Sequence, residues 1–329
     1  MNRRHFLSRV AGAGAMLGAS AHGPRGTLQA SDNVRTARRA SGGWRCDLAI
    51  AGGGLGGCAA ALAALRSGLR VVMTEETDWI GGQLTQQGVP PDEHRWIEEF
   101  GCTRSYRALR EGIRDYYRRH FPLTDAARAR PHLNPGDGMV SRLCHEPRVA
   151  LAVLNEWLAP YLAGGRLTLL LEHRVVAAEM RGDRVRALQT RSLRSGRELT
   201  LEAPWFIDAT ELGDLLPLTG TEFLTGAESR DDTGEWHAAR ERDPANQQAF
   251  TTCFAMDYVK GEDHTLDRPG DYRFWREFVP SLRPAWPGRL LSFTYTHPPT
   301  LEPRTLGFNP EGPAPGAAVN LWKIGRAHV

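Results

Sequence analysis

The sequence predicts an α/β protein in which a parallel sheet is combined with a short antiparallel meander. First, residues 44–75 pass from an apolar run through a glycine-rich turn and an alanine-rich segment to a second apolar run. Second, residues 166–210 alternate apolar runs with two turn signals. Third, the 329 residues are 41% hydrophobic and 24% charged, which is the composition of a globular protein.

Residues 44–75 predict a βαβ unit, in which two strands are joined by a helix. The run "WRCDLAI" (44–50) ends at "AGGGLGG", which contains the pattern G-x-G-x-x-G at Gly52, Gly54 and Gly57. In dinucleotide-binding βαβ units the first glycine allows a tight turn, the second lets a diphosphate reach the backbone, and the third lets the helix pack on the strand. "CAAALAALRSG" predicts that helix, and "LRVVMTE" predicts a second strand that ends at Glu75. The unit predicts a Rossmann-type site with the diphosphate at the helix N-terminus.

Glu75 indicates the kind of nucleotide. An acid at the end of the second strand is placed to hydrogen-bond a ribose hydroxyl, and it disfavours a 2′-phosphate. NADP is therefore not expected.

Three later motifs follow in order: "GGQLTQQGV" at 81–89, "SRLCHEPRVAL" at 141–151 and "FIDATELGDLLPLTG" at 206–220. Together with the glycine turn they resemble the family of FAD-dependent oxidoreductases with a glutathione-reductase-type nucleotide fold. The resemblance runs from about residue 46 to about residue 323. It implies FAD as cofactor, a Rossmann-type FAD-binding domain, and a redox reaction on a substrate that the family label leaves open.

The resemblance also implies further cofactor contacts. It places the stretch after Gly81 and Gly82 alongside the flavin, the backbone around Val175 and Val176 against the adenine, and the turn after residue 207 beside the pyrophosphate. The additional residues expected to bind the cofactor are Gln83, Thr85, Ala209, Thr210, Gly213 and Asp214, with Gln86 and Gln87 as further candidates. For Asp214 a plain turn or helix-cap role is the alternative.

The candidate catalytic residues are Cys144, His145 and Glu146. Pro147 is typical of the first turn of a helix, so the three residues before it are expected at a helix start, where the dipole can tune them. His145 is a candidate general base oriented by Glu146, and Cys144 a candidate nucleophile with a lowered pKa. The alternative is that Glu146 caps the helix and His145 is a structural hydrogen-bonding residue.

The domain organisation is expected as follows. Residues 1–21, with Arg3, Arg4 and a short Gly/Ala-rich run, resemble a twin-arginine signal peptide, and residues 22–43 are predicted to be a linker. The FAD-binding domain is expected at 44–215, with a helical insertion at about 91–140. Large apolar residues recur there at near-helical intervals, and most of the aromatic ones are expected in the core, with a lid over the flavin as the alternative; the residues are Trp96, Phe100, Tyr106, Leu109, Ile113 and Tyr117. An incomplete α+β substrate domain is expected at 216–323, with strands in "FTTCFAMDYV" (250–259) and "LLSFTYTHP" (290–298).

The last six residues, "IGRAHV" (324–329), equal the translation of a widely used sequencing adapter. We expect them to be an artefact and the natural protein to continue beyond Lys323. The flavin-ring half of the site is then incomplete in this sequence.

Charge and cysteine content exclude several classes. The net charge is +3, but residues 1–43 hold seven arginines and one aspartate, so the remainder is slightly acidic, which argues against a nucleic-acid partner. The short apolar run near the N-terminus does not predict a stable membrane span. The five cysteines show no cluster spacing, so no metal site is expected.

The sequence thus predicts an exported FAD-dependent oxidoreductase, periplasmic or extracellular, that acts on a small organic molecule by hydride or electron transfer. Its expected partners are that substrate and the twin-arginine export machinery; the oligomeric state is left open. One alternative is an NAD-dependent dehydrogenase, which explains Gly52 to Glu75 but not the later motifs. Another is an FAD-binding electron-transfer subunit without its own substrate pocket. A third is that the fragment as given is inactive.

Overall fold

The computed structural model describes residues 38–40, 42–248, 253–254, 256–283, 285, 288–297, 299–312, 316 and 319–323. The expected export signal (1–21), most of the expected linker (22–43) and the adapter-like end (324–329) lie outside the described residues.

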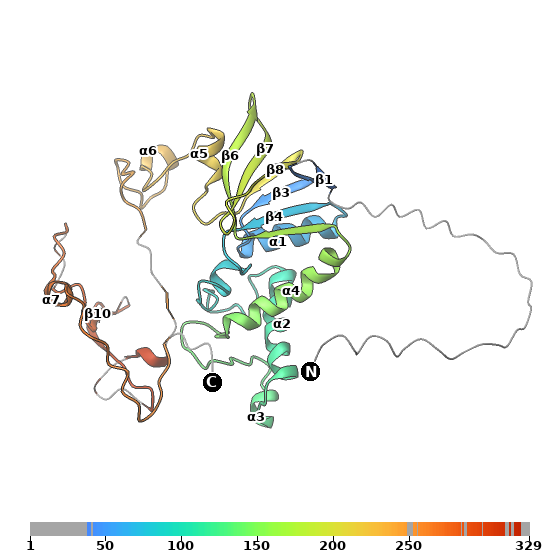
Figure 1. Ribbon diagram of the computed structural model, residues 1–329. Coiled ribbons are helices and arrows are strands. Elements are labelled where there is room, and N and C mark those ends of the chain that lie inside the picture. Colours follow the sequence, from blue (N-terminus) through green and yellow to red (C-terminus); the bar gives the residue numbers. More distant parts are fainter. Residues whose placement is uncertain are drawn as a thin grey trace, which may run out of the picture. The chain divides into compact units, whose positions relative to one another are not determined.

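A four-stranded parallel sheet with the order β5-β4-β3-β9 lies at the centre of the part of the chain expected to bind FAD, residues 44–215 (Figure 1). Each strand pairs in parallel with its neighbour, and α1 (Leu55–Arg66) supplies the crossover that β3 and β4 need. The predicted βαβ unit is confirmed. The strands are β3 (Leu48–Ala51), β4 (Val71–Glu75), β5 (Leu167–Leu171) and β9 (Trp205–Asp208).

A second sheet, β1-β2-β8-β7-β6, contains the predicted meander. Its strands β6, β7 and β8 pair antiparallel, and β2 adds to β8 in parallel. The connecting turns fall at 182–183 and 193–195, close to the two predicted turn signals. The strands are β1 (Arg38–Ala40), β2 (Gly43–Arg45), β6 (His173–Arg181), β7 (Arg184–Ser192) and β8 (Glu198–Glu202).

The apolar run 44–50, predicted as one strand, is two strands in two different sheets. The chain changes partner at Cys46 and Asp47. The N–H of Cys46 donates to the carbonyl of Glu202, next to β8, whereas the N–H of Asp47 donates to the carbonyl of Arg70, next to β4. The Asp47 carboxylate accepts hydrogen bonds from the backbone and side chain of Arg70, which fixes this change of partner.

The core follows the two faces of the parallel sheet. Because successive strand residues point to opposite faces, Ile50 and Met73 pack on one side and Ala49 and Val72 on the other. The first face is covered by α1, α2 (Arg104–His120) and α4 (Pro147–Ala163) (Figure 1). The second face is covered by the meander sheet and α5 (Leu215–Thr219).

The predicted helical insertion is present but begins later than its aromatic spacing indicates. Thr103 caps α2, since its hydroxyl oxygen accepts a hydrogen bond from the N–H of Tyr106. A second short helix, α3 (Asp125–Arg128), follows. Trp96 and Phe100, which we expected mainly in the core, precede α2; they are 50% and 58% exposed and stack on each other with centroids 6.1 Å apart. The core expectation is wrong for these two residues.

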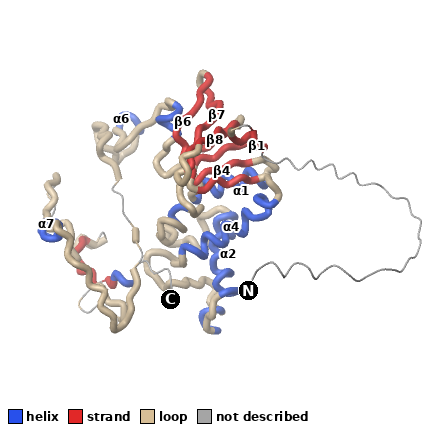
Figure 2. Tube along the Cα trace, viewed as in Figure 1, coloured by secondary structure: helices blue, strands red, loops and turns tan. Residues whose placement is uncertain are grey.

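After α5 most of the described chain is loop, as Figure 2 shows. The predicted strand in "LLSFTYTHP" is confirmed as β10, whereas residues 253–254 and 256–259 of the predicted strand 250–259 are not in a strand, and 250–252 and 255 lie outside the described residues. Among the described residues beyond Leu215, no hydrophobic side chain is buried. The elements are α6 (Arg230–Thr233), α7 (Tyr272–Glu277), β10 (Thr294–Thr296), β11 (Pro303–Gly307), β12 (Val319–Asn320) and the 3-10 helices η1 (Gly82–Leu84, earlier in the chain) and η2 (Leu321–Lys323).

Candidate functional site

A cavity of about 180 Å³ lies at the carboxyl ends of β3, β4, β5 and β9. In open α/β sheets this edge is where ligands bind, because the loops that follow the parallel strands meet there. The lining residues are Gly52, Gly54, Thr74, Glu75, Glu76, Thr77, Gln86, His173, Arg174, Val175, Ala209, Thr210, Glu211, Leu212 and Asp214.

The glycines after β3 are required by close backbone contacts. Gly52 has a φ of +95°, and a Cβ there would lie 2.2 Å from the carbonyl oxygen of Ala209. A Cβ on Gly57 would lie 2.1 Å from the carbonyl oxygen of Gly52, so this glycine lets α1 approach the turn. Gly54 is the N-cap residue of α1, and no side chain caps that helix end by a hydrogen bond. The geometry therefore fits an anion at the N-terminus of α1.

The second glycine pair packs directly on the first turn. The N–H of Gly81 donates to the carbonyl of Gly53 at 2.8 Å, and a Cβ on Gly82 would lie 3.1 Å from the Cα of Gly54. The two turns thus form one continuous backbone surface beside the cavity. Gly81 and Gly82 shape this surface without lining the cavity themselves.

Glu75 lines the cavity and is buried. Its Oε2 accepts a hydrogen bond from the N–H of Gly53 at 2.9 Å, and its Oε1 accepts hydrogen bonds from the N–H and hydroxyl of Thr77, both at 2.9 Å. The carboxylate therefore joins the glycine turn to the end of β4. Its expected contact with a ribose remains a prediction.

The turn after β9 is organised by Asp208, a residue that the sequence analysis did not single out. Its Oδ1 accepts hydrogen bonds from the N–H and hydroxyl of Thr210, and its Oδ2 accepts one from the N–H of Leu215 at 2.8 Å, at the start of α5. The hydroxyl of Thr210 in turn accepts the N–H of Asp214. Asp214 is the N-cap residue of α5, but its side chain makes no capping hydrogen bond, and it lines the cavity.

Several expected cofactor residues lie beside the cavity rather than in its lining: Gly57, Gly81, Gly82, Gln83, Thr85, Val176 and Gly213. Thr85 is buried and its hydroxyl donates to the carbonyl of Ile80 at 2.7 Å, which closes the second glycine turn. At the adenine position expected from the resemblance, Val175 lines the cavity and its neighbour Val176 does not.

Sequence reasoning missed the polar residues that follow β4 and β5. Glu76 and Arg174 form an ion pair at 3.4 Å, and His173 donates from Nδ1 to the carbonyl of Leu171. Their position directly after two predicted parallel strands was the available signal, because the carboxyl ends of such strands share one edge.

His145 is buried, with 2% of its surface exposed. Its Nδ1 lies 2.9 Å from the carbonyl oxygen of Glu146, so Nδ1 carries the proton and Nε2 the lone pair. Nε2 is buried without a hydrogen-bond partner among the described residues. Burial lowers the pKa of His145, which keeps the ring neutral at pH 7. Glu146 thus orients His145 through its backbone oxygen.

The expectation of a lowered pKa at Cys144 is wrong. Cys144 is fully buried, and this burial raises the pKa of its thiol. The Sγ–H donates to the carbonyl of Ser141, and the backbone N–H donates to Oδ1 of Asn134 at 2.6 Å. The helix start is present as predicted, since α4 begins at Pro147 after the N-cap residue Glu146, but Cys144 lies two residues before this cap and the helix does not activate its thiol.

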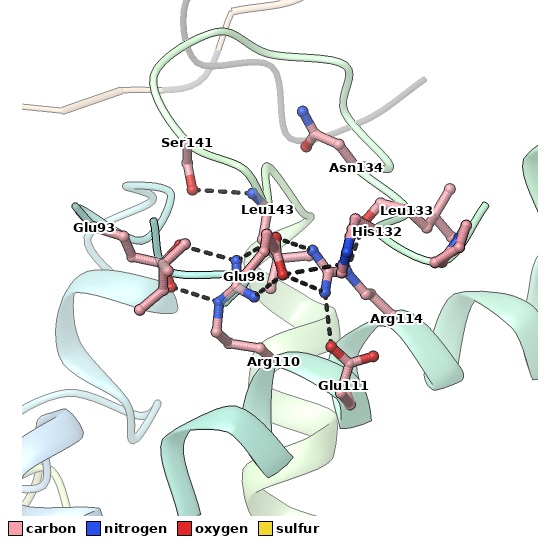
Figure 3. Close-up of polar contacts among 12 residues, drawn as sticks. Glu93, Glu98, Arg110, Glu111, Arg114, His132, Leu133, Asn134, Ser141 and Leu143 are labelled. Atoms are coloured by element: carbon pink, nitrogen blue, oxygen red, sulfur yellow. Dashed lines mark hydrogen bonds and ion pairs between the residues drawn. The ribbon is translucent and has the colours of Figure 1, made fainter. Parts of the chain in front are cut away.

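A buried charge cluster joins the loop before α2 to that helix (Figure 3). The side chain of Arg110, 1% exposed, donates to both Glu93 and Glu98, and that of Arg114, fully buried, donates to Glu98 and to the carbonyl of Leu133. Burial opposes the charged form of Glu98, but the two arginines outweigh it and lower its pKa to about 2. The charge of Glu93 also raises the pKa of His145, against the effect of burial.

Other kinds of site would be a second cavity, a metal site or a membrane-spanning helix. A hollow of about 330 Å³ lies between α2 and α4, and none of the expected site residues lines it. Within the described part of the chain, no group of three or more His, Cys, Asp or Glu side chains is placed to hold a metal ion. No helix among those residues is both long and apolar enough to cross a membrane.

Comparisons with known proteins bear on this site. No curated protein matches the chain. The matching solved structures include the myxobacterial chondrochloren halogenase CndH, at 19% identity and a TM-score of 0.32, with 50% of this chain and 37% of that chain covered. They also include the glycerol-3-phosphate dehydrogenase from Bacillus halodurans complexed with FAD, at 15% identity and a TM-score of 0.35, with 53% and 36% covered.

A third match is the flavin-dependent monooxygenase PieE in complex with FAD and substrate, at 19% identity and a TM-score of 0.33, with 56% and 33% covered. The chain thus spans about a third of the length of these three structures. A family model described as FAD dependent oxidoreductase matches residues 47–314, which include both glycine turns, the helix start at Pro147 and the turn after β9. The chain belongs to the FAD-dependent oxidoreductase family, whose cofactor is FAD.

Proposed function

We propose that the cavity at the carboxyl edge of the parallel sheet binds the ADP half of FAD. We propose further that the full protein uses this cofactor to oxidise or reduce a small organic molecule. The observation that carries the proposal is the pair of glycine turns, where Gly52, Gly54 and Gly82 leave backbone bare at the N-terminus of α1. A diphosphate needs this combination of close approach and unpaired N–H groups.

Each group of residues in and beside the cavity has a proposed role. The N–H groups at the start of α1 bind the diphosphate, and Glu75 accepts a hydrogen bond from a ribose hydroxyl while it keeps its contact with Gly53. Val175 lies against the adenine, and Thr210 and Asp214, which also line the cavity, lie beside the diphosphate.

Bound FAD supplies hydride or electron transfer at its ring. Among the three catalytic candidates, His145 is the one that fits a general base, since it is neutral and keeps a lone pair at Nε2. Hydrogen bonds hold the backbone of the residues before and after His145. The N–H of Cys144 donates to Oδ1 of Asn134, and the N–H of Glu146 donates to the hydroxyl of Tyr117 at 2.7 Å. We propose that Nε2 takes a proton from the substrate in the full protein; in this structure Nε2 is buried, and His145 is not among the residues that line the cavity.

We also propose that the protein is exported in folded form by the twin-arginine machinery and acts in the periplasm or outside the cell. Arg3 and Arg4 followed by Phe6 and Leu7 support this. Replacement of both arginines by lysine should keep the protein in the cytoplasm of a bacterial host. Export of this variant at the wild-type level would contradict the proposal.

The cofactor proposal is tested with Gly54→Ala in the longest open reading frame that contains this chain. The nearest atom to an added Cβ is Oε1 of Glu211 at 3.2 Å, at the end of a flexible side chain, so the fold should tolerate the change. The methyl group occupies the space that the diphosphate needs. We expect wild-type protein to show flavin absorption bands and the variant to bind FAD about tenfold or more weakly.

The matched control is Gly56→Ala, two residues further on, where an added Cβ meets nothing within 4 Å. This variant should bind FAD as the wild type does and should unfold at the same or a higher temperature. Colourless wild-type protein that does not bind added FAD would overturn the proposed site.

A further inference from the structure

Glu211, in the turn after β9, lies across the glycine turns. Its Oε1 is 3.2 Å from the position that a Cβ on Gly54 would take and 3.1 Å from the corresponding position on Gly82. The carboxylate therefore lies where the two bare backbone segments meet. Glu211 also lines the same cavity as Gly52 and Thr210.

This position is electrostatically favourable for an anion. Gly54 is the N-cap residue of α1, no side chain caps the helix end by a hydrogen bond, and the first turn of α1 contains no acidic residue. The N-terminus of a helix carries partial positive charge and unpaired N–H groups. The carboxylate of Glu211 supplies negative charge at this end.

Two of the other acidic groups of the cavity wall are held by neighbours: Glu75 by Gly53 and Thr77, and Glu76 by Arg174. Asp214 also lines the cavity, and its side chain makes no capping hydrogen bond at the start of α5. The side chain of Glu211 is exposed and makes no hydrogen bond or ion pair within the described part of the chain. It can therefore turn into solvent without breaking a buried contact.

We propose that Glu211 occupies the position of the cofactor diphosphate in the free protein and is displaced when FAD binds. This rests on the proposed function of the cavity. A carboxylate and a diphosphate at the same helix end repel each other, so the two anions exclude one another there. Glu211 thereby lowers the affinity for every ligand that carries the diphosphate, whereas it leaves a ligand without phosphate unaffected.

The test is Glu211→Gln, which keeps the shape of the side chain and removes its charge. Protein freed of bound flavin is titrated with FAD by flavin fluorescence, and with ADP and adenosine by calorimetry. We expect the variant to bind FAD and ADP about fivefold more tightly than the wild type, because a charge near a helix terminus contributes on the order of 1 kcal/mol. Adenosine should bind both proteins equally.

The matched control is Glu222→Gln, which removes the same charge from an exposed residue that does not line the cavity. It should leave all three affinities unchanged. Equal affinity of wild type and Glu211→Gln for FAD and ADP would overturn the inference while leaving the proposed function intact, and so would an equal gain for adenosine. Failure of every protein to bind FAD would overturn the proposed function and the inference together.

Discussion

The buried carboxylate of Glu75 connects the end of β4 to the glycine turn after β3. Its two oxygens accept hydrogen bonds from the N–H of Gly53 and from the N–H and hydroxyl of Thr77. A group of this kind serves the fold before any cofactor binds, because the N–H of Gly53 is otherwise left without an acceptor in a buried position.

We therefore expect Glu75→Gln to weaken both the fold and the cofactor site. The side-chain amide of the glutamine places an N–H donor opposite one of the N–H groups that Glu75 accepts. Loss of such a buried acceptor lowers the free energy of unfolding by about 1–3 kcal/mol. Thermal unfolding with and without FAD measures both effects. Glu76→Gln, which alters an exposed ion pair, is the control and should change stability by less than about 1 kcal/mol. A stability equal to the wild type would contradict the structural role.

His145 gives the second prediction at this scale. His145→Ala should retain FAD with an unchanged absorption spectrum, while turnover falls by about 10²–10⁴-fold, the usual contribution of a general base. The substrate is first found by anaerobic screening for flavin bleaching. Since burial lowers the pKa of His145, the basic form prevails from below the usual histidine range upward. Wild-type activity should therefore rise with pH and reach its plateau below that range. Full activity of the variant would exclude His145 as the base.

At the residue scale, the sequence predicts positions whose constraint is local. Gly52 and Gly57 were predicted because the turn requires a positive φ at Gly52 and leaves no room for a Cβ at Gly57, although the distant carbonyl of Ala209 also blocks a Cβ at Gly52. The partners of Asp208, Thr210 and Leu215, are close in the sequence, so its role in the turn was predictable and was missed. Glu211 was not predictable, because it lies against the distant backbone of Gly54 and Gly82, which a single sequence does not show. The same reason explains the error at Cys144, whose burial depends on tertiary packing rather than on the helix that follows it.

At the scale of elements, α2 is held by charge rather than by apolar contacts alone. Arg110 and Arg114 are turned inward toward Glu93 and Glu98, which precede the helix (Figure 3). A helix rich in arginine predicts an exposed surface, and the spacing of the aromatic residues predicts that these form its buried face. The helix itself was predictable from spacing, but its inward-facing arginines were not, since their partners lie outside the helix.

Removal of one cluster partner should destabilise the domain strongly. Arg110→Ala leaves the carboxylates of Glu93 and Glu98 buried without this partner, which typically costs about 3–5 kcal/mol. Denaturant unfolding followed by circular dichroism measures the loss. The control Arg191→Ala breaks an exposed pair with Glu198 and should cost at most about 1 kcal/mol. Similar losses in the two variants would contradict a structural role for the cluster.

The cluster also predicts a pH dependence. The pKa of Glu98 is about 2 in the folded protein, below its value of about 4.3 in an unfolded chain. A lowered folded pKa means that the contribution to stability is complete above the unfolded value and is lost as the pH falls toward 2. Between about pH 5 and about pH 2, the unfolding free energy of Glu98→Gln should therefore decrease less than that of the wild type. An identical slope in both proteins would show that other carboxyl groups dominate acid unfolding.

At the scale of the whole molecule, both hydrophobic clusters lie between residues 46 and 215. Within the part of the chain that the structure describes, Leu215 is the last buried apolar residue, and beyond it Trp236, Phe254 and Leu266 are among many large apolar residues that are exposed. Short apolar runs beyond residue 216 predicted the start of a substrate domain. Whether apolar residues find a core depends on what packs against them, and composition carries no information about that.

This distribution of burial predicts where the chain opens most easily. Amides of β3 and β4, in the middle of the parallel sheet and covered on both faces, should exchange with solvent most slowly. Those of β10 and β11 should exchange fastest among the strands, because no buried apolar contact supports them. Hydrogen exchange followed by mass spectrometry on the full chain measures both.

Addition of FAD should slow exchange at residues 52–57 and 209–214, which line or flank the proposed site, and leave residues 294–307 unchanged. Protection of residues 294–307 as strong as that of β3 without FAD would mean that a further polypeptide surface, such as a second copy of the chain, covers their apolar side chains. Repeating the experiment at several protein concentrations distinguishes these cases, since only protection by a second copy increases with concentration.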